Sequence, residues 1–200
     1  MDRSSRSSSD PRAAITQLLE FDRGRPRFQV ESLEAPSEGV FAGLRLRLRV
    51  DRVDRVDGGL VIIDYKTGRA ETGQWRGARL DAPQLPLYAA LQDGEVAAIA
   101  FAAVDSHAAR FHGVGAGDGI ADGILPAGKF ALTEDKQTGF TWQQVQDRWA
   151  GWLASLARAY VEGNAAVDPK GPQTCRLCHL STLCRVSPEL DGDALESGDE

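Results

Sequence analysis

Residues 47–68 have the sequence RLRVDRVDRVDGGLVIIDYKTG, and this stretch decides the fold because it predicts two β-strands joined by a tight turn. From residue 44 to residue 50, leucine or valine alternates with arginine, which is the period-two pattern of a half-buried strand. The run from Leu60 to Ile63 is apolar at every position and predicts a central strand buried on both faces. Residues 57–59, Asp-Gly-Gly, are typical of the turn between them.

Two acids and a lysine on this hairpin occupy positions that suit metal-dependent chemistry. Asp51 continues the polar series of the first strand, and the apolar positions change phase after it, which predicts that the strand bulges or ends there. Asp64 and Lys66 are two residues apart, so they project from one face of the second strand while Tyr65 points to the other. Two carboxylates beside an ammonium group are what metal-dependent cleavage of a phosphodiester needs. The alternative is a salt bridge at a strand end.

A second polar pair lies on a predicted helix after the hairpin, in residues 82–90, APQLPLYAA. Pro83 suits the first turn of this helix. Gln84 and Tyr88 are four residues apart and therefore share one helical face. Two explanations remain open for this pair: a role beside a substrate, or a hydrogen bond from the helix to the neighbouring strand.

Three cysteines fall within ten residues near the C-terminal end, with the spacing C-x2-C-x5-C: Cys175, Cys178 and Cys184. An odd number packed this closely does not make a disulfide framework, and the polar N-terminus is not a signal peptide, so we expect a cytoplasmic protein. Clustered thiols in that compartment favour a metal or iron–sulfur site. His179 could complete a Cys3His zinc site by composition, but its place between the cysteines is poor. Unligated thiols or a partial cluster rank ahead of zinc.

These motifs together resemble the nuclease core of the PD-(D/E)XK superfamily, specifically the RecB/AddB type and its bacterial "probable DNA repair protein" relatives. The resemblance rests on DRVDRVDGGLVIIDYKTG, on a Q-x-x-x-Y motif and on CRLCHLSTLC, and it spans about residues 31–186. It implies an α/β fold with a restriction-endonuclease-like core, in which helices flank a central mixed sheet and the acids lie at one end.

The resemblance also assigns roles to particular residues. It implies that Asp51 and Asp64 bind Mg²⁺ or Mn²⁺, that the backbone carbonyl of Tyr65 is a further metal ligand, and that Lys66 is the catalytic lysine. The residues of the Q-x-x-x-Y motif, Gln84 and Tyr88, would lie near the site and the DNA. The implied function is a DNA nuclease domain of repair or recombination that works beside a helicase or a helicase-like partner. The alternative is a catalytically weak DNA-binding or assembly module.

Two residues that the resemblance calls for have no candidate in this chain. In the family one upstream cysteine joins the three C-terminal cysteines to hold a [4Fe–4S] cluster, but no cysteine precedes Cys175. An upstream histidine at the metal site is missing too, since the first histidine is His107. We therefore expect the cluster to be incomplete, and the chain to be either the C-terminal part of a longer protein or a gene product truncated at its start.

Composition predicts one domain with polar ends. The chain has 200 residues, of which 42% are hydrophobic, enough to bury a sizeable core. We expect a disordered tail over residues 1–12, a nuclease-like domain over 13–187 with the cysteine segment at 175–184, and an acidic disordered tail over 188–200. No run of apolar residues approaches the length of a membrane span, so no membrane partner is expected.

The net charge of −6 does not argue against DNA, because the last thirteen residues alone carry six acids. The remaining body is near neutral, and binding would depend on local arginines that contact phosphates. The candidates follow the first strand of the hairpin: Arg45, Arg47, Arg49 and Arg52. The alternative for this row is a solvated face of the sheet.

The remaining segments are predicted to be scaffold. A short helix is expected over residues 13–21, a hairpin over residues 96–104 and 109–114, and a loop over the glycine-rich residues 113–128, to which no cofactor is assigned. A capping box of Thr141 and Gln144 predicts the start of a long amphipathic helix. Its stripe of three tryptophans predicts core or a subunit interface rather than a base-stacking platform.

Overall fold

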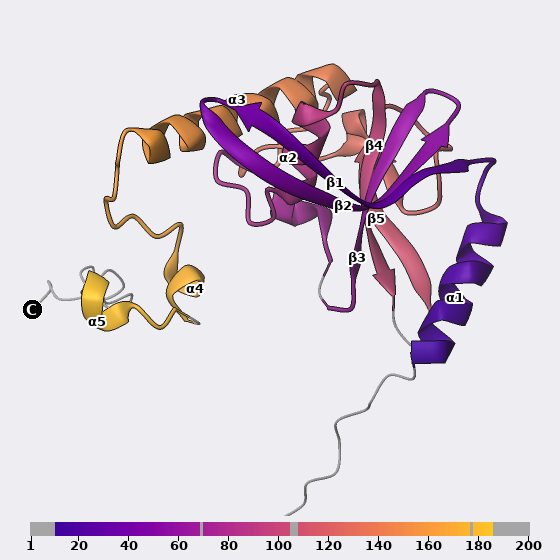
Figure 1. Ribbon diagram of the computed structural model, residues 1–200, viewed down its shortest axis with the longest axis horizontal. Coiled ribbons are helices and arrows are strands. Elements are labelled where there is room, and N and C mark those ends of the chain that lie inside the picture. Colours follow the sequence, from indigo (N-terminus) through magenta and orange to yellow (C-terminus); the bar gives the residue numbers. More distant parts are fainter. Residues whose placement is uncertain (1–10, 69, 105–107, 177, 186–200) are drawn as a thin grey trace, which may run out of the picture. The chain divides into compact units, whose positions relative to one another are not determined.

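The computed structural model describes residues 11–68, 70–104, 108–176 and 178–185. They divide into two compact units, Met1–Arg158 and Ala159–Glu200. Figure 1 shows the helices and strands, which are in chain order α1 (Pro11–Gly24), β1 (Gln29–Phe41), β2 (Leu44–Val56), β3 (Gly59–Lys66), the 3₁₀ helix η1 (Thr72–Trp75), α2 (Gln84–Leu91), β4 (Val96–Val104), β5 (Ala109–Gly115), β6 (Ile124–Pro126), the 3₁₀ helix η2 (Ala127–Lys129), α3 (Trp142–Val161), α4 (Pro172–Cys175) and α5 (Ser181–Cys184).

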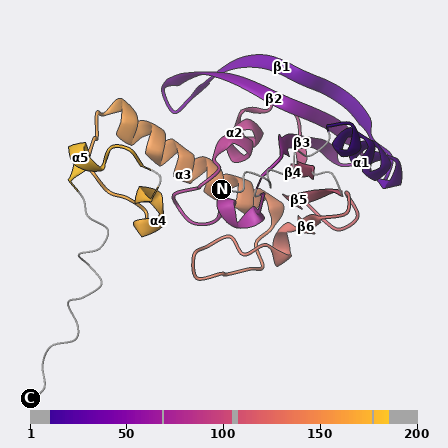
Figure 2. The same ribbon diagram turned by 90° about the horizontal axis from the view of Figure 1, so that it is seen from below.

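The first unit is built on one six-stranded sheet in the order β1-β2-β3-β4-β5-β6, which Figure 2 shows from one edge to the other. The pairs β1/β2, β2/β3 and β4/β5 are antiparallel, whereas β3/β4 and β5/β6 are parallel. A parallel pair needs a crossover connection, and η1 and α2 supply it between β3 and β4. The expected mixed sheet flanked by helices is confirmed.

The hairpin of β2 and β3 forms as the sequence predicts, with Val56 opposite Gly59 at its turn. Gly59 has a φ of +124°, and a Cβ atom there would lie 2.3 Å from the carbonyl oxygen of Glu95, so only glycine fits. The strand does not end at Asp51, as one form of the prediction had it, but continues to Val56. The expected change in the alternation of apolar residues is present. Val50 and Val53 are three residues apart and would face opposite sides of a regular strand, but both belong to the same core cluster.

Apolar residues cover both faces of the sheet. One cluster joins Ile62, Phe101 and neighbouring strand residues to α2 and to the tryptophans of α3. The other joins Ile63, Phe111 and the small residues of β4 to Phe21 of α1. β3 and its neighbour β4 are the two central buried strands, and Val61, Ile62 and Ile63 of β3 are each 0% exposed. The sequence run that is apolar at every position thus lies between two layers of helix.

The other expectations for the scaffold hold, with one correction. The hairpin of β4 and β5 is confirmed, and the helix expected over 13–21 is longer, since α1 runs from Pro11 to Gly24. The capping box before α3 is present, with Thr141 N–H donating to Gln144 Oε1 at 2.8 Å. Residues 113–128 are not all loop: β5 continues through Gly115, and β6 and η2 follow within the segment. Glycines in a paired strand hid that continuation, because they carry no side-chain pattern.

Two of the three tryptophans of α3 are core residues, as predicted. Trp142 donates from Nε1 to the carbonyl oxygen of Val96 at 2.6 Å, and Trp149 donates to that of Trp75 at 2.9 Å. These bonds satisfy polar groups that would otherwise be buried without a partner.

Within the described residues, no helix has the length and apolar character needed to cross a membrane.

Candidate active site

Asp51 and Asp64 meet where the ladder between β2 and β3 ends. The last cross-strand pair is Arg52 with Ile63, so one residue further along places the two acids opposite each other. The backbone N–H of Tyr65 donates to Asp51 Oδ2 at 2.9 Å and fixes this carboxylate beside the end of β3. The hairpin spacing therefore brings together the two carboxylates that the sequence predicts as neighbours.

Asp64 and Lys66 form an ion pair on one face of β3, with 2.6 Å between Asp64 Oδ2 and Lys66 Nζ. The Asp64 side chain is 6% exposed and that of Lys66 is 38% exposed, so the acid is buried while the lysine reaches solvent. Burial raises the pKa of Asp64 above its ordinary value; Lys66 lowers it, and the negative charge of Asp51 raises it. Tyr65 packs against the cluster on the opposite face, as alternation predicts.

The chemistry of these oxygens fits a hard divalent cation. Asp64 Oδ2 is buried and, despite the nearby Lys66 ammonium, has no hydrogen bond of normal geometry to any described residue. A cation would satisfy this oxygen and relieve the unfavourable proximity of the two carboxylates. Within the described residues no group of three or more His, Cys, Asp or Glu side chains is placed to hold a metal. Water molecules would therefore supply the remaining ligands of a cation held by Asp51 and Asp64, which suits Mg²⁺.

Gln84 and Tyr88 lie on one face of α2, and their hydrogen bonds lead to β2. Gln84 Nε2 donates to the Tyr88 hydroxyl at 2.8 Å, and this hydroxyl donates to the carbonyl oxygen of Arg49 at 2.8 Å. Arg49 precedes Asp51 by two residues, so the pair ties the helix to the strand that carries the first acid. The Gln84 side chain is exposed, whereas Tyr88 is buried. A role for either residue at a substrate stays a prediction.

The arginines of β2 fall into two environments. Arg45, Arg47 and Arg49 are exposed and alternate with half-buried leucines. Arg47 pairs with Glu38, and Arg49 with Glu34, both on the neighbouring edge strand β1. The solvated sheet face that the sequence left open as an alternative is therefore an accurate description of these cross-strand pairs.

Arg52 differs from the exposed arginines, because it is 6% exposed and enclosed by acids. Its guanidinium donates to Asp54 at 2.6 Å, to Asp22 of α1 at 2.7 Å and to the Tyr65 hydroxyl at 3.3 Å. Burial acts to lower the pKa of Arg52, but these hydrogen bonds outweigh it and raise the pKa. A guanidinium that is buried and held by two aspartates is poorly placed to contact a DNA phosphate, so the burial of Arg52 argues against its predicted role in DNA binding, which stays untested.

Arg25 completes this buried cluster, which sequence patterns did not indicate. It donates to Asp22 and to Asp54, each at 2.8 Å, and its guanidinium lies 4.1 Å from the centre of the Phe28 ring. Two arginines and two aspartates thus balance in charge and fasten α1 to β2. The only sequence signal is that Asp54 interrupts the hydrophobic end of the strand, which does not identify partners about 30 residues away.

The cysteine segment belongs to the second unit. None of Cys175, Cys178 and Cys184 is in a disulfide. The backbone N–H of Cys178 donates to the carbonyl oxygen of Cys175 at 3.1 Å, which is a turn and not a ligand cage. The described residues contain no group of three potential ligands in this segment either, so they do not fit a cluster that needs four thiolates.

Comparison with known protein families shows which family the chain belongs to. The sequence model of the PD-(D/E)XK nuclease superfamily matches residues 5–185. The chain belongs to the PD-(D/E)XK nuclease superfamily. The match covers the hairpin with its acids and lysine, the α2 helix and the cysteine segment, and the mixed sheet is the restriction-endonuclease-like core of this superfamily. No curated protein matches the chain significantly.

Proposed function

We propose that this PD-(D/E)XK domain is a Mg²⁺- or Mn²⁺-dependent deoxyribonuclease. The observation that carries the proposal is the meeting of Asp51 and Asp64 beside Lys66, with a buried oxygen of Asp64 left without a normal hydrogen bond. Asp51 and Asp64 would hold the cation, and the backbone carbonyl of Tyr65 is a further candidate ligand. When bound, such an ion activates water and neutralises negative charge on the phosphate.

Lys66 would act on the reacting phosphate or on the attacking water. The Lys66 side chain is 38% exposed, so its ammonium group can reach a bound strand from the end of β3. The centre of the Phe101 ring lies 5.7 Å from Lys66 Nζ, which places the ammonium group in a cation–π contact with the ring. An ammonium in that place can orient water and stabilise charge that develops in the transition state.

Gln84 and Tyr88 would support this site rather than carry out the chemistry. The Tyr88 hydroxyl fixes the backbone of β2 just before Asp51, and the exposed amide of Gln84 is available to a DNA strand. Among the exposed arginines of β2, Arg45 is the strongest candidate for a phosphate contact, because no described residue pairs with it, whereas Arg47 and Arg49 would have to leave their glutamates.

The order of the three sequence motifs also supports a biological setting. That setting is a nuclease of the RecB/AddB type with a role in DNA repair or recombination, a helicase-like partner and a cytoplasmic location. Cysteines outside any disulfide agree with a reducing compartment.

A cleavage assay with Mn²⁺ on linear single-stranded and double-stranded DNA tests the function directly. We expect cleavage that requires the metal and that Asp64→Ala abolishes. Calorimetric titration with Mn²⁺ separates metal binding from chemistry, and Asp64→Ala should remove the binding heat. Equal binding by the parent and by Asp64→Ala would contradict the metal site.

A second function has support from one observation: no third acidic or histidine ligand accompanies the two carboxylates among the described residues. A weakly held metal would make the chain a DNA-binding or assembly module with little activity. DNA binding without metal-dependent cleavage, in the same assay, would favour this alternative.

A further inference from the structure

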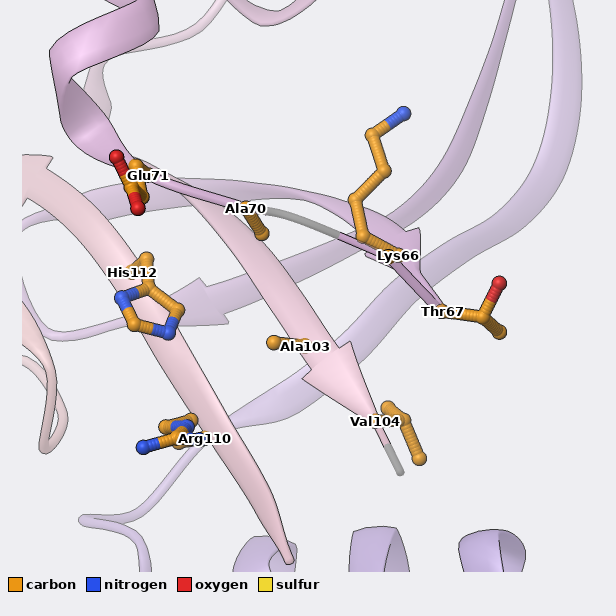
Figure 3. Close-up of a pocket in the computed structure, with 9 residues that line it drawn as sticks. Lys66, Thr67, Ala70, Glu71, Ala103, Val104, Arg110 and His112 are labelled. Carbon is orange, nitrogen blue, oxygen red and sulfur yellow. The ribbon is translucent and has the colours of Figure 1, made fainter. Parts of the chain in front are cut away.

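A pocket of about 300 Å³ opens beside Lys66 at the end of the sheet where β3 and β4 finish. Thr67, Gly68 and Ala70 after β3 form one side, Ala103 and Val104 of β4 lie in the middle, and Arg110 and His112 of β5 form the other side. Figure 3 shows Lys66 and Arg110 on opposite sides of Ala103. The residues assigned to metal and DNA above do not explain this pocket.

The register of the sheet explains why the pocket exists. Lys66 pairs with Ala103, and Ala103 pairs with Arg110, so the three form one row across β3, β4 and β5. Paired residues project from the same face, and adjacent strands are about 4.8 Å apart, so Lys66 and Arg110 are separated by about 10 Å along the row. The middle residue has only a methyl group, which leaves a hollow between two long cations.

A parallel row one step along places His112 on the same face. Asp64 pairs with Phe101, and Phe101 pairs with His112. His112 is half-buried and, like Arg110, has neither a hydrogen bond nor an ion pair to any described residue. The metal-binding acid, the lysine, the histidine and the arginine therefore face the same side of the sheet.

The charge of the lining favours a phosphate. Lys66 and Arg110 are two cations, and Glu71 is the one acid among the described residues that line the pocket. Glu71 takes part in a capping box with Gln74 at the start of η1. Arg110 is exposed and pairs with no acid in the described part of the chain, in contrast to Arg47, Arg49, Arg52 and Arg55, which each pair with an acid. A planar guanidinium is well suited to a phosphate.

We propose that Arg110 binds the phosphate adjacent to the scissile one, and that the hollow over Ala103 receives the nucleotide between the two phosphates. This inference rests on the proposed nuclease function and specifies its substrate class. A pocket of about 300 Å³ is at the small end of ligand sites and admits one nucleotide, not a duplex. The site thus takes an unpaired strand, and the His112 ring offers a surface for its base.

A methylphosphonate scan tests the inference in the full-length protein. Single-stranded oligonucleotides carry one neutral methylphosphonate at each position in turn, and their affinity is measured in Ca²⁺, which takes the same oxygen ligands. In the parent, one position next to the scissile phosphate should weaken binding by about tenfold. The Arg110→Ala variant should bind ordinary DNA more weakly by about the same factor. A methylphosphonate at that position should not weaken its binding further, and the slope of its affinity against salt concentration should be smaller by about 0.7. Arg110→Lys should recover part of the loss.

Two further variants complete the test. Arg23→Ala removes an exposed arginine of α1, whose residues pack on the opposite face of the sheet, and should leave the scan unchanged. Ala103→Leu fills the hollow and should raise KM for single strands while its thermal unfolding matches the parent; Ala103→Ser, which keeps the hollow, should retain the parental KM.

An Arg110→Ala scan identical to the parental scan would overturn the inference. If the parent cleaves DNA with Mn²⁺ and the two scans agree, the phosphate subsite is wrong and the nuclease function stands. If the parent cleaves nothing, the proposed function fails, whereas the binding scan still decides whether Arg110 contacts a phosphate.

Discussion

At the scale of single residues, the metal-binding role proposed for Asp64 conflicts with the stability of the metal-free protein. Its carboxyl group is buried, which raises its pKa, because the charged form loses hydration that Lys66 replaces only in part. The unfolded chain keeps the ordinary value. Folding therefore favours the protonated form, and stability falls as the pH rises through the window between the ordinary and the raised value. Above that window the loss is complete.

This sign predicts that Asp64→Asn stabilises the metal-free protein at neutral pH. Removing the buried charge should raise the thermal midpoint, by about 2–4 °C for each kcal/mol gained in a chain of this size. The gain should shrink in acid, where Asp64 itself is neutral. Calorimetric scans at several pH values in EDTA measure it, and the exposed Asp93→Asn is the matched control. A midpoint lowered at neutral pH would contradict the assignment of Asp64 as a strained, function-bearing acid.

Lys66 gives the second prediction at this scale. Lys66→Ala should reduce Mn²⁺-dependent cleavage by orders of magnitude and leave DNA affinity and the fold nearly intact, because a lysine that acts on developing charge contributes mainly to the transition state. Single-turnover kinetics together with binding measurements separate the two effects. Lys129→Ala, which removes an exposed lysine from the same unit, is the control and should cleave normally. Cleavage by Lys66→Ala at the parental rate would make Lys66 a structural residue.

At the scale of elements, β2 joins the site to the rest of the fold in two ways. Its exposed half pairs with β1 through surface ions, and its buried half is fastened to α1 by the cluster of Asp22, Arg25, Arg52 and Asp54. The buried cluster also reaches the Tyr65 hydroxyl, and the Tyr65 backbone holds Asp51. The arrangement of Asp51 thus depends on a helix that contributes no residue to the chemistry.

Breaking one member of this cluster should destabilise the protein strongly. Arg25→Ala leaves the Asp54 carboxylate, which is 0% exposed, without one of its two cations, and we expect a loss of about 3–5 kcal/mol. Arg49→Ala removes a cation from an exposed pair and should cost about 0–1 kcal/mol. Urea unfolding at equal m-values compares the two variants. Similar losses for both would mean that burial does not distinguish the two kinds of pair.

Local periodicity explains which parts of the fold could be predicted. Three local features predicted the hairpin and one side of the candidate site: the alternation in β2, the apolar run of β3 and the two-residue spacing of Asp64 and Lys66. The buried role of Arg52 and the row from Lys66 to Arg110 depend on which segments become neighbours in the sheet. One sequence carries no direct signal for such long-range pairing. A buried arginine in a strand, such as Arg52, therefore could not be distinguished from the exposed arginines beside it.

At the scale of the whole molecule, the two units carry different chemistry. The carboxylates proposed to bind metal, Lys66 and both core clusters belong to Met1–Arg158, whereas the cysteines belong to Ala159–Glu200. The sheet buries its residues without any contribution from the cysteines. We therefore expect that the proposed cleavage by the first unit does not require a metal or cluster in the second.

The last prediction follows from the number and placement of the thiols. A [4Fe–4S] cluster normally takes four thiolates, the chain has three, and the described residues around them form no group of ligands. Protein purified without oxygen should contain well under one cluster per chain, with little absorbance in the visible iron–sulfur band. Iron and sulfide analysis measures this, and a triple variant with Cys175, Cys178 and Cys184 changed to serine is the control. Its residual Mn²⁺-dependent cleavage should equal that of the parent, because the carboxylates lie in the other unit. An air-stable four-iron cluster at full occupancy, lost together with cleavage in the triple variant, would show that a fourth ligand exists and that the two units depend on each other.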